Sequence, residues 1–459
     1  MHIHILGICG TFMGGLAQLA RSAGHVVSGS DEHTYPPMST QLEAAGIRLS
    51  EGYDPAHLDP APDLVIVGNA LSRGNPAVEH VLNRGIEYTS GPRWLGENYL
   101  RGRTVLAVAG THGKTTTSSM LAWILEHAGL APGFLIGGVP LNFGCSARDG
   151  ERYFVVEADE YDTAFFDKRA KFVHYRPRVL VMNNLEYDHA DIYPDLKSIQ
   201  TQFHHLVRTI PGEGTILSNA RDAHLEEVLE RGCWSRLERF ALQPDAPGEP
   251  EWSVTMKRPD GRRLAVERAG GQAAEFEWSQ LGRHNAMNAC AAIAAAHAVG
   301  VPPADAARAL ADFRGVKRRL EFVCEAHGVR VYDDFAHHPT AIRLTLEGLR
   351  RNVGNARILV ALEPRSNTMR AGVHADELGP ALVAADYVWL KTGDGIDWDP
   401  HDALAPLDGR ARVVTRTGDL LAQMHESLKP GDHVVFMSNG GFDGATERFA
   451  SALKARERV

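Results

Sequence analysis

A single local pattern recurs along the whole chain of 459 residues and constrains its fold more than any other feature. A short apolar run is followed by a glycine-bearing turn and then by a stretch with helical periodicity, as in "HIHILGICGTFMGGLA" near the N-terminus and "TVLAVAGTHGKTTT" at residues 104–117. Strands that alternate with helices in this way form βαβ units, which build parallel sheets. The sequence therefore predicts an α/β fold with mostly parallel sheets and with ligands at the carboxyl ends of the strands.

The chain is too long for one ordinary hydrophobic core, since a domain usually holds about 100 to 200 residues. Two stretches, "SGPRWLGENYLRGR" and "FRGVKRR", interrupt the alternation of strands and helices and are interpreted as joins between domains. We therefore expect three α/β domains, at residues 1–100, 101–314 and 315–459.

The composition excludes several classes of function. The formal net charge is −9 and no basic block stands out, which argues against a general nucleic-acid binder. No apolar run reaches the roughly 18 residues that a membrane span needs, and the apolar N-terminus is interrupted by Gly7 and Gly10. The five cysteines are scattered, which indicates a reducing compartment. We expect a cytoplasmic protein that binds neither nucleic acid nor a membrane and has no obligate protein partner.

The segment "VLAVAGTHGKTTT" at residues 105–117 resembles a phosphate-binding loop in which Val108 replaces the first glycine. Gly110 and Gly113 allow a tight turn whose N–H groups face an anion at the start of a helix. Lys114 can then reach the β- and γ-phosphates of a nucleotide, and the Thr115 hydroxyl can bind Mg²⁺. The alternative is an ordinary turn with a solvated lysine. The residues expected to bind ATP here are Gly110, Thr111, His112, Gly113, Lys114, Thr115 and Thr116.

The variant loop and the motifs that follow it resemble the Mur ligases, which are ATP-dependent amide ligases of peptidoglycan assembly. The resemblance extends over the whole chain in order, through the segments "GTHGKT", "VVEADEYDTAFFD", "NNLEYDHADIYPD", "GRHNAMNACAAIAAA", "FRGVKRRLEF" and "YDDFAHHPTAI". It implies an N-terminal Rossmann-like domain that binds UDP, a central P-loop ATPase-like domain, and a C-terminal Rossmann-like domain that closes on ATP. The implied cofactor is Mg²⁺, with ATP as cosubstrate.

The resemblance implies that Thr115, Glu157 and His189 bind Mg²⁺ and that Lys114, Glu157 and His189 are catalytic. Oxygen donors are the usual ligands of Mg²⁺, so residue chemistry alone favours a capping or core role for His189. Several members of the family carry a carbamylated lysine about fifteen residues after this histidine. This chain has His204 in that region, and either His204 or a water takes the place of the carbamate.

The resemblance also implies a nucleotide site built from the central helix and the last domain. His284, Asn285 and Asn288 are expected near the adenine, and Asn285 and Asn288 are three residues apart on one helical face. Arg319 is expected on the phosphates, although a solvated linker charge is the alternative. Asp334, at a strand end, is expected at the ribose hydroxyls or else in a turn, and His337 follows it.

The first block is expected to bind the UDP-sugar. Its glycine-rich turn is not the G-x-G-x-x-G fingerprint. A Rossmann dehydrogenase domain is the alternative, and the second nucleotide loop, the acids of the Mg²⁺ type and the lack of a recognisable hydride-transfer site count against it. The candidate residues for the UDP-sugar are Gly7, Gly10, Thr11, Met13, Gly14, Asp31, Ser72, Arg73 and Asn75.

Within the family, "GICGTFMGGLA" and "DDFAHHPT" resemble the ligases that act on UDP-N-acetylmuramate. The segments "YRPR", "LEYDHADIY", "EPRSNTMR" and "MSNGGF" resemble the branch that recycles murein peptides. The implied reaction joins the tripeptide L-Ala-γ-D-Glu-meso-diaminopimelate to the lactyl carboxylate of UDP-N-acetylmuramate. The alternative amine is free L-alanine. Arg365 and Arg370 are the candidates for peptide binding because a guanidinium pairs well with a carboxylate, and a charged surface loop is the other interpretation. The segment "FFDKRAKFVHYRPR" is also expected to face the peptide.

Overall fold

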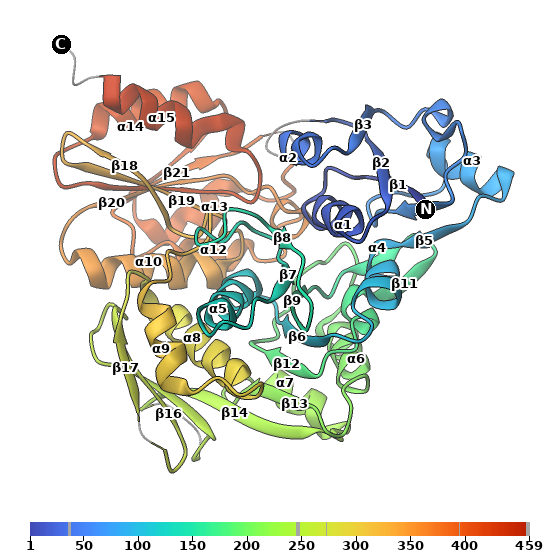
Figure 1. Cartoon of the computed structure of the whole chain (residues 1–459). Helices are drawn as coiled ribbons and strands as arrows, with labels where there is room; N and C mark the ends of the chain where they lie inside the picture. Colours follow the sequence, from blue (N-terminus) through green and yellow to red (C-terminus); the bar gives the residue numbers. More distant parts are fainter. Residues whose placement is uncertain (35–37, 245–247, 272, 394, 456–459) are drawn as a thin grey trace.

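Three α/β units follow one another along the chain, as the alternation of strands and helices predicts (Figure 1). The computed structural model describes residues 1–34, 38–244, 248–271, 273–393 and 395–455. Each unit has its own main sheet. The N-terminal sheet is parallel throughout, the C-terminal sheet has one antiparallel pair at an edge, and the central sheet has antiparallel pairs at both edges. The predicted fold class is confirmed.

The N-terminal unit is a parallel five-stranded sheet in the order β3-β2-β1-β4-β5, which is a doubly wound arrangement. Its strands are β1 (His2–Leu6), β2 (Val26–Asp31), β3 (Arg48–Glu51), β4 (Leu64–Val67) and β5 (Tyr88–Ser90). Its helices are α1 (Thr11–Ser22), α2 (Met38–Ala44), the 3₁₀ turn η1 (Pro55–Leu58), α3 (Pro76–Arg84), α4 (Gly91–Trp94) and the π-helical turn η2 (Leu95–Tyr99). The sequence pattern did not predict β3, β5 or the helical turns after β5.

The central unit is a ten-stranded sheet in the order β17-β16-β15-β14-β13-β12-β6-β9-β7-β8. The strands from β7 to β15 in this order pair in parallel, and antiparallel pairs close both edges. The strands are β6 (Thr104–Ala109), β7 (Gly133–Leu135), β8 (Ala147–Arg148), β9 (Tyr153–Ala158), β12 (Val179–Met182), β13 (Thr215–Asn219), β14 (Arg236–Gln243), β15 (Trp252–Met256), β16 (Arg263–Arg268) and β17 (Ala274–Glu277).

A separate hairpin and six helical segments complete the central unit. The hairpin consists of β10 (Asp162–Ala164) and β11 (Asp167–Ala170). The helical segments are α5 (Lys114–His127), η3 (Lys171–His174), α6 (Leu196–Val207), α7 (Ala223–Glu230), α8 (Gly282–His297) and α9 (Pro303–Ala311). Helices α5, α8 and α9 bury an apolar cluster against one face of the sheet, so the Ala-rich stretch of α8 is a core helix.

The C-terminal unit is a six-stranded sheet in the order β18-β19-β23-β20-β21-β22, in which only the β18–β19 pair is antiparallel. Its strands are β18 (Glu321–Ala326), β19 (Val329–Asp334), β20 (Ile358–Leu362), β21 (Tyr387–Lys391), β22 (Ala411–Val414) and β23 (His433–Met437). Its helices are α10 (Pro339–Val353), α11 (Asn367–Arg370), α12 (Ala375–Ala381), α13 (Pro400–Leu404), η4 (Ala405–Leu407), α14 (Thr417–Ser427), η5 (Phe442–Gly444) and α15 (Ala445–Ala455). Two apolar clusters cover its two faces.

The N-terminal and central units share one apolar cluster, which includes residues of both sheets. Helix α1 packs so closely on β7 and β8 that a Cβ at Gly15 would lie 2.4 Å from a Leu135 methyl carbon. The C-terminal unit instead rests on α8 through α10, where a Cβ at Gly348 would lie 3.0 Å from the Gly282 Cα (Figure 1). The first two units are therefore joined by a packed core and the third by a narrower contact.

The described part of the chain contains no helix with the combined length and apolar character that a bilayer crossing demands. All five cysteines are free thiols.

Candidate active site between the three units

One cavity of about 1480 Å³ opens where the three units meet. Its wall includes the glycine turn of the N-terminal unit, the phosphate loop and strand ends of the central unit, and the loops after β19 and β20 of the C-terminal unit. A single small-molecule site usually measures about 300–1,000 Å³, so this cavity has room for more than one substrate. Ligands were expected at the carboxyl ends of the strands, and this cavity is at those ends.

The loop between β6 and α5 has the turn geometry that its glycines predict. Gly110 and Gly113 have φ angles of 144° and 80°, which side-chain-bearing residues rarely adopt. Asn184, just after β12, braces the loop, because its side-chain oxygen accepts from the His112 N–H at 2.7 Å and its amide donates to the His112 carbonyl at 3.1 Å. A Cβ at Gly113 would lie 2.6 Å from the Asn288 side-chain oxygen. The loop is therefore held rigidly between β12 and α8.

Lys114, the first residue of α5, is the centre of a buried charge network. Its Nζ lies 2.9 Å from a Glu160 carboxylate oxygen and 3.7 Å from Asp159. Burial alone would lower the pKa of Lys114, but Glu160 and Asp159 outweigh it and raise that pKa above its usual value. Burial alone would likewise raise the pKa of Glu160, yet Lys114 and His189 hold it at about 2. The ammonium and the carboxylate are therefore both charged.

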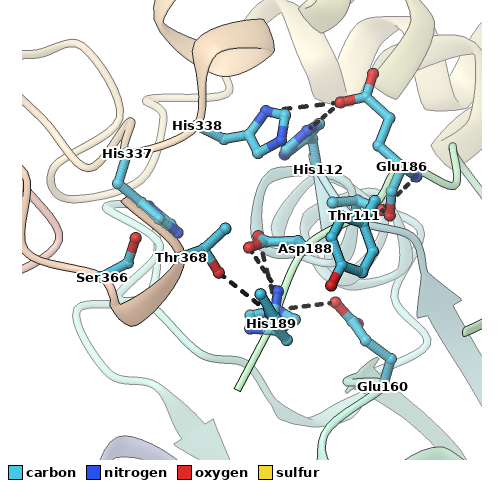
Figure 2. Close-up of polar contacts among 12 residues, drawn as sticks. Thr111, His112, Glu160, Glu186, Asp188, His189, His337, His338, Ser366 and Thr368 are labelled. Carbon is cyan, nitrogen blue, oxygen red and sulfur yellow. Dashed lines mark hydrogen bonds and ion pairs between the residues drawn. The ribbon is translucent and has the colours of Figure 1, made fainter. Parts of the chain in front are cut away.

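His189 is the other neighbour of Glu160 in this network (Figure 2). Its Nε2 lies 3.3 Å from Glu160 Oε1 and 3.7 Å from Asp188 Oδ2, and its φ of 56° places it in a left-handed turn. Burial lowers the pKa of His189, but these two carboxylates more than offset burial and leave the pKa raised. The predicted Mg²⁺ ligand thus forms an ion pair in this structure, and it would bind a cation only after leaving Glu160.

Thr115 and Glu157 are brought together as the resemblance implies. The Thr115 hydroxyl donates to Glu157 Oε1 at 2.9 Å, and Glu157 Oε2 accepts from the Gly137 N–H at 2.6 Å. Burial and the neighbouring Asp159 raise the pKa of Glu157, so a nearby cation would favour its charged form. Two cis ligands of an octahedral Mg²⁺ at about 2.1 Å are about 3.0 Å apart. The two oxygen donors therefore fit one Mg²⁺ by chemistry and by spacing.

Arg319 connects the C-terminal unit to the phosphate loop. Its guanidinium donates to the Thr115 hydroxyl at 3.3 Å and lies 4.8 Å from the centre of the Phe335 ring. Asp334 fixes the backbone on both sides of this contact, since its carboxylate accepts from the N–H groups of Leu320 at 2.6 Å and Ala336 at 2.7 Å. Arg319 is thus no solvated linker charge, and Asp334 serves the turn while also lining the cavity.

Two further contacts join the loop of residues 186–191 to the C-terminal unit, and Figure 2 shows the one between Glu186 and His338. The Glu186 carboxylate accepts from His112 Nε2 at 2.9 Å and lies 3.6 Å from His338 Nδ1, just before α10. Asn367 donates to Asp191 at 2.9 Å. Near them, burial lowers the pKa of His337 to about 4. The third unit therefore touches the phosphate loop, the loop after β12 and the cavity at once.

The three residues expected near the adenine lie together at the start of α8. His284 lines the cavity, and burial lowers its pKa to about 4. Asn288 donates to Asn285 Oδ1 at 3.3 Å, and Asn285 donates to the Leu281 carbonyl at 2.8 Å. Neutral His284 and these two amides form a polar, uncharged wall, which suits a nucleobase.

The candidates for the UDP-sugar divide into two groups. Gly10, Thr11 and Met13, at the start of α1, line the cavity, whereas Gly7, Gly14, Asp31, Ser72, Arg73 and Asn75 are not among its lining residues. Asp31 accepts from the Cys9 N–H at 2.7 Å and so supports the glycine turn. Asn75 caps α3, and Arg73 forms a bidentate pair with Glu79. The roles of these residues in sugar binding stay predictions.

The peptide candidates also divide. Arg365 lines the cavity, whereas Arg370 lies outside it and donates to the Gly395 carbonyl at 3.0 Å. His204 lies on α6 with its ring 6.2 Å from that of Trp234 and is not part of the cavity wall, so nothing brings it to the carbamate position. The segment 165–178 packs on the N-terminal unit, where Phe166 contacts Tyr88 edge to face, and Lys171 is its one residue in the cavity wall. Whether the segment faces the peptide stays a prediction.

Sequence reasoning missed Glu160, Asn184, Glu186 and Lys171 as site residues. Glu160, Asn184 and Glu186 lie inside motifs that the sequence had already singled out, "EADEYD" and "NNLEYD", each of which directly follows a buried strand. Position after a strand was therefore an available signal for these three. Lys171 lies inside the segment "FFDKRAKFVHYRPR", which the sequence singled out as a whole, but it follows a hairpin that periodicity did not reveal.

Comparisons with known proteins agree with this geometry. Three family models match the chain in succession: the Mur ligase family catalytic domain at residues 2–103, the Mur ligase middle domain at residues 108–296, and the Mur ligase glutamate ligase domain at residues 318–440. Together they cover most of the chain.

Relatives resemble the chain over its full length. The UDP-N-acetylmuramate–L-alanyl-γ-D-glutamyl-meso-2,6-diaminoheptandioate ligase of Escherichia coli (strain K12) is 54% identical over 99% of this chain and 98% of its own. A crystal structure of a murein peptide ligase from Psychrobacter arcticus 273-4 is 46% identical, covers 99% of both chains and has a TM-score of 0.78. The UDP-N-acetylmuramate–L-alanine ligase of Kineococcus radiotolerans is 38% identical over 97% of this chain and 94% of its own. The chain belongs to the Mur ligase family.

Proposed function

We propose that this protein is an ATP-dependent amide ligase that joins the tripeptide L-Ala-γ-D-Glu-meso-diaminopimelate to the lactyl carboxylate of UDP-N-acetylmuramate, in peptidoglycan recycling. The observation that carries the proposal is the single cavity shared by three units. A glycine turn at a helix N-terminus lines one side of it, a phosphate loop with Lys114 a second, and Arg365 a third. Such groups suit a diphosphate, a triphosphate and a carboxylate, respectively, which supports the proposal.

The first chemical step is attack of the lactyl carboxylate on the γ-phosphate of ATP, which gives an acyl phosphate and ADP. Charge then develops on the transferred phosphoryl group, and Lys114 and the N–H groups of the phosphate loop are positioned to stabilise it. Mg²⁺, held by Thr115 and Glu157, would neutralise phosphate charge; His189 would join them after leaving Glu160. In the second step the peptide amine attacks the acyl carbon, and phosphate leaves with the carboxylate oxygen.

Water must be kept from the acyl phosphate between these steps, because hydrolysis would waste the ATP. The contacts of Arg319 with Thr115 and of Asn367 with Asp191 hold the C-terminal unit over the cavity. We infer that the unit opens at the join of residues 313–319 to admit substrates and closes before the chemistry. His337 and Arg319 would then approach the nucleotide from the C-terminal side.

The choice of a tripeptide over free L-alanine is supported by two relatives. The ligases of Escherichia coli and Haemophilus influenzae that are named for the tripeptide are 54% and 51% identical to the chain, whereas the relative named for L-alanine in Kineococcus radiotolerans is 38% identical. The two reactions share the nucleotide chemistry, so the amine is the point to test. A cytoplasmic location stays a prediction.

The deciding experiment measures ADP release with ATP, Mg²⁺, UDP-N-acetylmuramate and acceptors of graded length: L-alanine, L-Ala-γ-D-Glu and the tripeptide. We expect turnover with the tripeptide and little with L-alanine. When the lactyl carboxylate carries ¹⁸O, one labelled oxygen should appear in the orthophosphate. Robust turnover with L-alanine alone would assign the chain to the alternative reaction, and unlabelled orthophosphate would exclude the acyl phosphate route.

A further inference from the structure

Lys171 is a buried lysine between the N-terminal and central units that the reaction described above does not use. It is the first residue of η3, its residue is 5% exposed, and it lines the cavity. Its ammonium lies 5.2 Å from the centre of the Phe12 ring, which belongs to α1, and 5.1 Å from the centre of the Tyr161 ring. One aromatic ring from each unit therefore flanks the charge.

Within the described ranges, Lys171 forms no hydrogen bond through its side chain and no ion pair. Lys114, in contrast, has Glu160 at 2.9 Å. Burial lowers the pKa of Lys171, and the more distant charges of Asp159 and Asp162 only partly offset it. A cation taken out of water without a paired anion is costly, and such groups concentrate at functional sites. An anion bound beside the ammonium would therefore stabilise the charged form of this side chain.

The position of Lys171 is fixed from both sides. Its backbone N–H donates to the Tyr161 carbonyl at 2.9 Å, and the preceding hairpin is closed by a 2.7 Å hydrogen bond from the Thr163 hydroxyl to the Arg169 carbonyl. At the hairpin tip, Phe166 packs on Tyr88 of the N-terminal unit, where β11 lies beside β5 and α4 in Figure 1. The backbone of Lys171 is therefore held in place, and its buried side chain is not a surface charge.

The surroundings indicate which anion this lysine receives. Lys114 is already paired with Glu160, so of these two buried lysines Lys171 is the one with no carboxylate at ion-pair distance among the described residues. If the UDP diphosphate binds at the turn before Phe12 and ATP binds at the phosphate loop, an acid carried by the sugar must pass between them. Lys171 faces the cavity in this interval, on the N-terminal side.

We propose that Lys171 binds the lactyl carboxylate of the UDP-sugar and holds it beside the phosphate loop for attack on the γ-phosphate. This inference rests on the proposed function. It makes Lys171 the residue by which the enzyme recognises that the sugar carries an acid, because the same sugar nucleotide without the lactyl group offers the lysine no partner.

The test compares two ligands by calorimetry on the full chain without ATP: UDP-N-acetylmuramate, and UDP-N-acetylglucosamine, which lacks the lactyl group. We expect Lys171→Gln to weaken binding of UDP-N-acetylmuramate at least about tenfold, as for a buried charge pair that loses one partner, and to leave UDP-N-acetylglucosamine unchanged. Lys171→Arg should restore part of the preference. The matched control is Lys168→Gln, three residues earlier, whose side chain is 70% exposed and pairs with Asp162.

Equal weakening of both ligands by Lys171→Gln would overturn the inference and leave Lys171 a structural part of the wall. Unchanged binding of UDP-N-acetylmuramate would overturn it as well. If the glutamine variant does not fold, the Lys171→Arg protein, which keeps the charge, takes its place in the test. An equal loss of affinity for both ligands in that protein would also contradict the inference. Failure of the proposed function looks different, because the unaltered protein would then neither bind UDP-N-acetylmuramate nor release ADP with it.

Discussion

At the scale of single residues, the charge network around Lys114 determines what the phosphate loop can do. Glu160 holds the buried ammonium at 2.9 Å, and His189 shares the same carboxylate. The network neutralises three buried groups before any substrate arrives. A phosphate that enters must compete with Glu160 for the lysine, so the network also tunes how tightly Lys114 can hold it.

Replacing Lys114 by methionine should lower turnover by about 10²–10³-fold, because a donor to the developing phosphoryl charge is lost. The same change leaves Glu160 with His189 as its remaining close partner and should also lower the free energy of unfolding. ADP release with the tripeptide, measured well below the unfolding temperature, checks the first effect. Lys168→Met is the control, and a Lys114→Met protein with near-normal turnover would remove Lys114 from the mechanism.

His4 links the stability of the N-terminal unit to pH. Its ring is buried between the hydroxyls of Ser28 and Ser30, at 2.9 and 2.7 Å, and burial lowers its pKa to about 3. The unfolded chain binds a proton at this histidine below about pH 6.5, whereas the folded protein does not do so until about pH 3. The stabilisation is therefore complete above pH 6.5 and is lost as the pH falls toward 3, by up to about 1.4 kcal/mol per pH unit.

Urea unfolding between pH 7 and pH 4.5 measures this loss. We expect His4→Gln, which can still bond to both serines, to show a shallower fall in the free energy of unfolding than the unaltered protein. Other buried histidines are present in both proteins and cancel in the comparison. If the free energy of unfolding falls equally with pH in both proteins, the pKa of His4 in the folded state is close to the ordinary histidine value.

At the scale of elements, the sequence predicted those whose local chemistry decides their form. The β6–α5 loop follows from Gly110 and Gly113, and its lysine and threonine follow from the spacing. The β10–β11 hairpin could not be predicted in this way, because its short strands owe their position to contacts with the N-terminal unit, such as Phe166 on Tyr88. The same holds for Lys171, whose importance depends on which residues surround it in space.

Helix α3 presents a case in which one residue has two possible roles. Asn75 was expected at the sugar, and in the structure its side-chain oxygen accepts from the N–H groups of Ala77 at 3.1 Å and Val78 at 3.2 Å. We expect Asn75→Ala to lower the free energy of unfolding by about 1 kcal/mol, and Asn75→Asp, which keeps the cap, to change it little. Thermal unfolding and the KM for UDP-N-acetylmuramate should be measured together. A KM that rises in both variants would assign Asn75 to the sugar.

At the scale of the whole molecule, the three units differ in how they are joined. The N-terminal and central units share a continuous apolar cluster, whereas the C-terminal unit is attached through the contact of α10 with α8 and through polar bonds around Arg319. The sequence predicted two joins but could not reveal this difference, because shared apolar packing depends on the faces that α1 and the central sheet present to each other. The C-terminal unit is therefore the part that can move.

Arg319→Ala should reduce kcat by about 10²–10³-fold and leave the affinity for UDP-N-acetylmuramate unchanged, since Arg319 reaches the phosphate loop from the C-terminal unit. Binding of the sugar nucleotide by calorimetry and ADP release by a coupled assay separate the two effects. Lys317→Ala, an exposed change in the same join, is the control. A loss of sugar affinity equal to the loss of kcat would contradict a role confined to closure.

The Thr115 hydroxyl has a consequence for inhibitor design, because it touches the central unit at Glu157 and the C-terminal unit at Arg319. Coupling between two equilibria is reciprocal, so ATP that tightens this junction is itself bound more tightly when the junction is closed. A small molecule bound between the Phe335 loop and the phosphate loop would hold the junction open and would therefore lower the affinity for ATP without occupying the ATP site. By the same reciprocity, ATP would weaken the binding of such a compound, but only up to the factor set by the coupling, whereas a compound that mimics adenine competes with ATP without that limit.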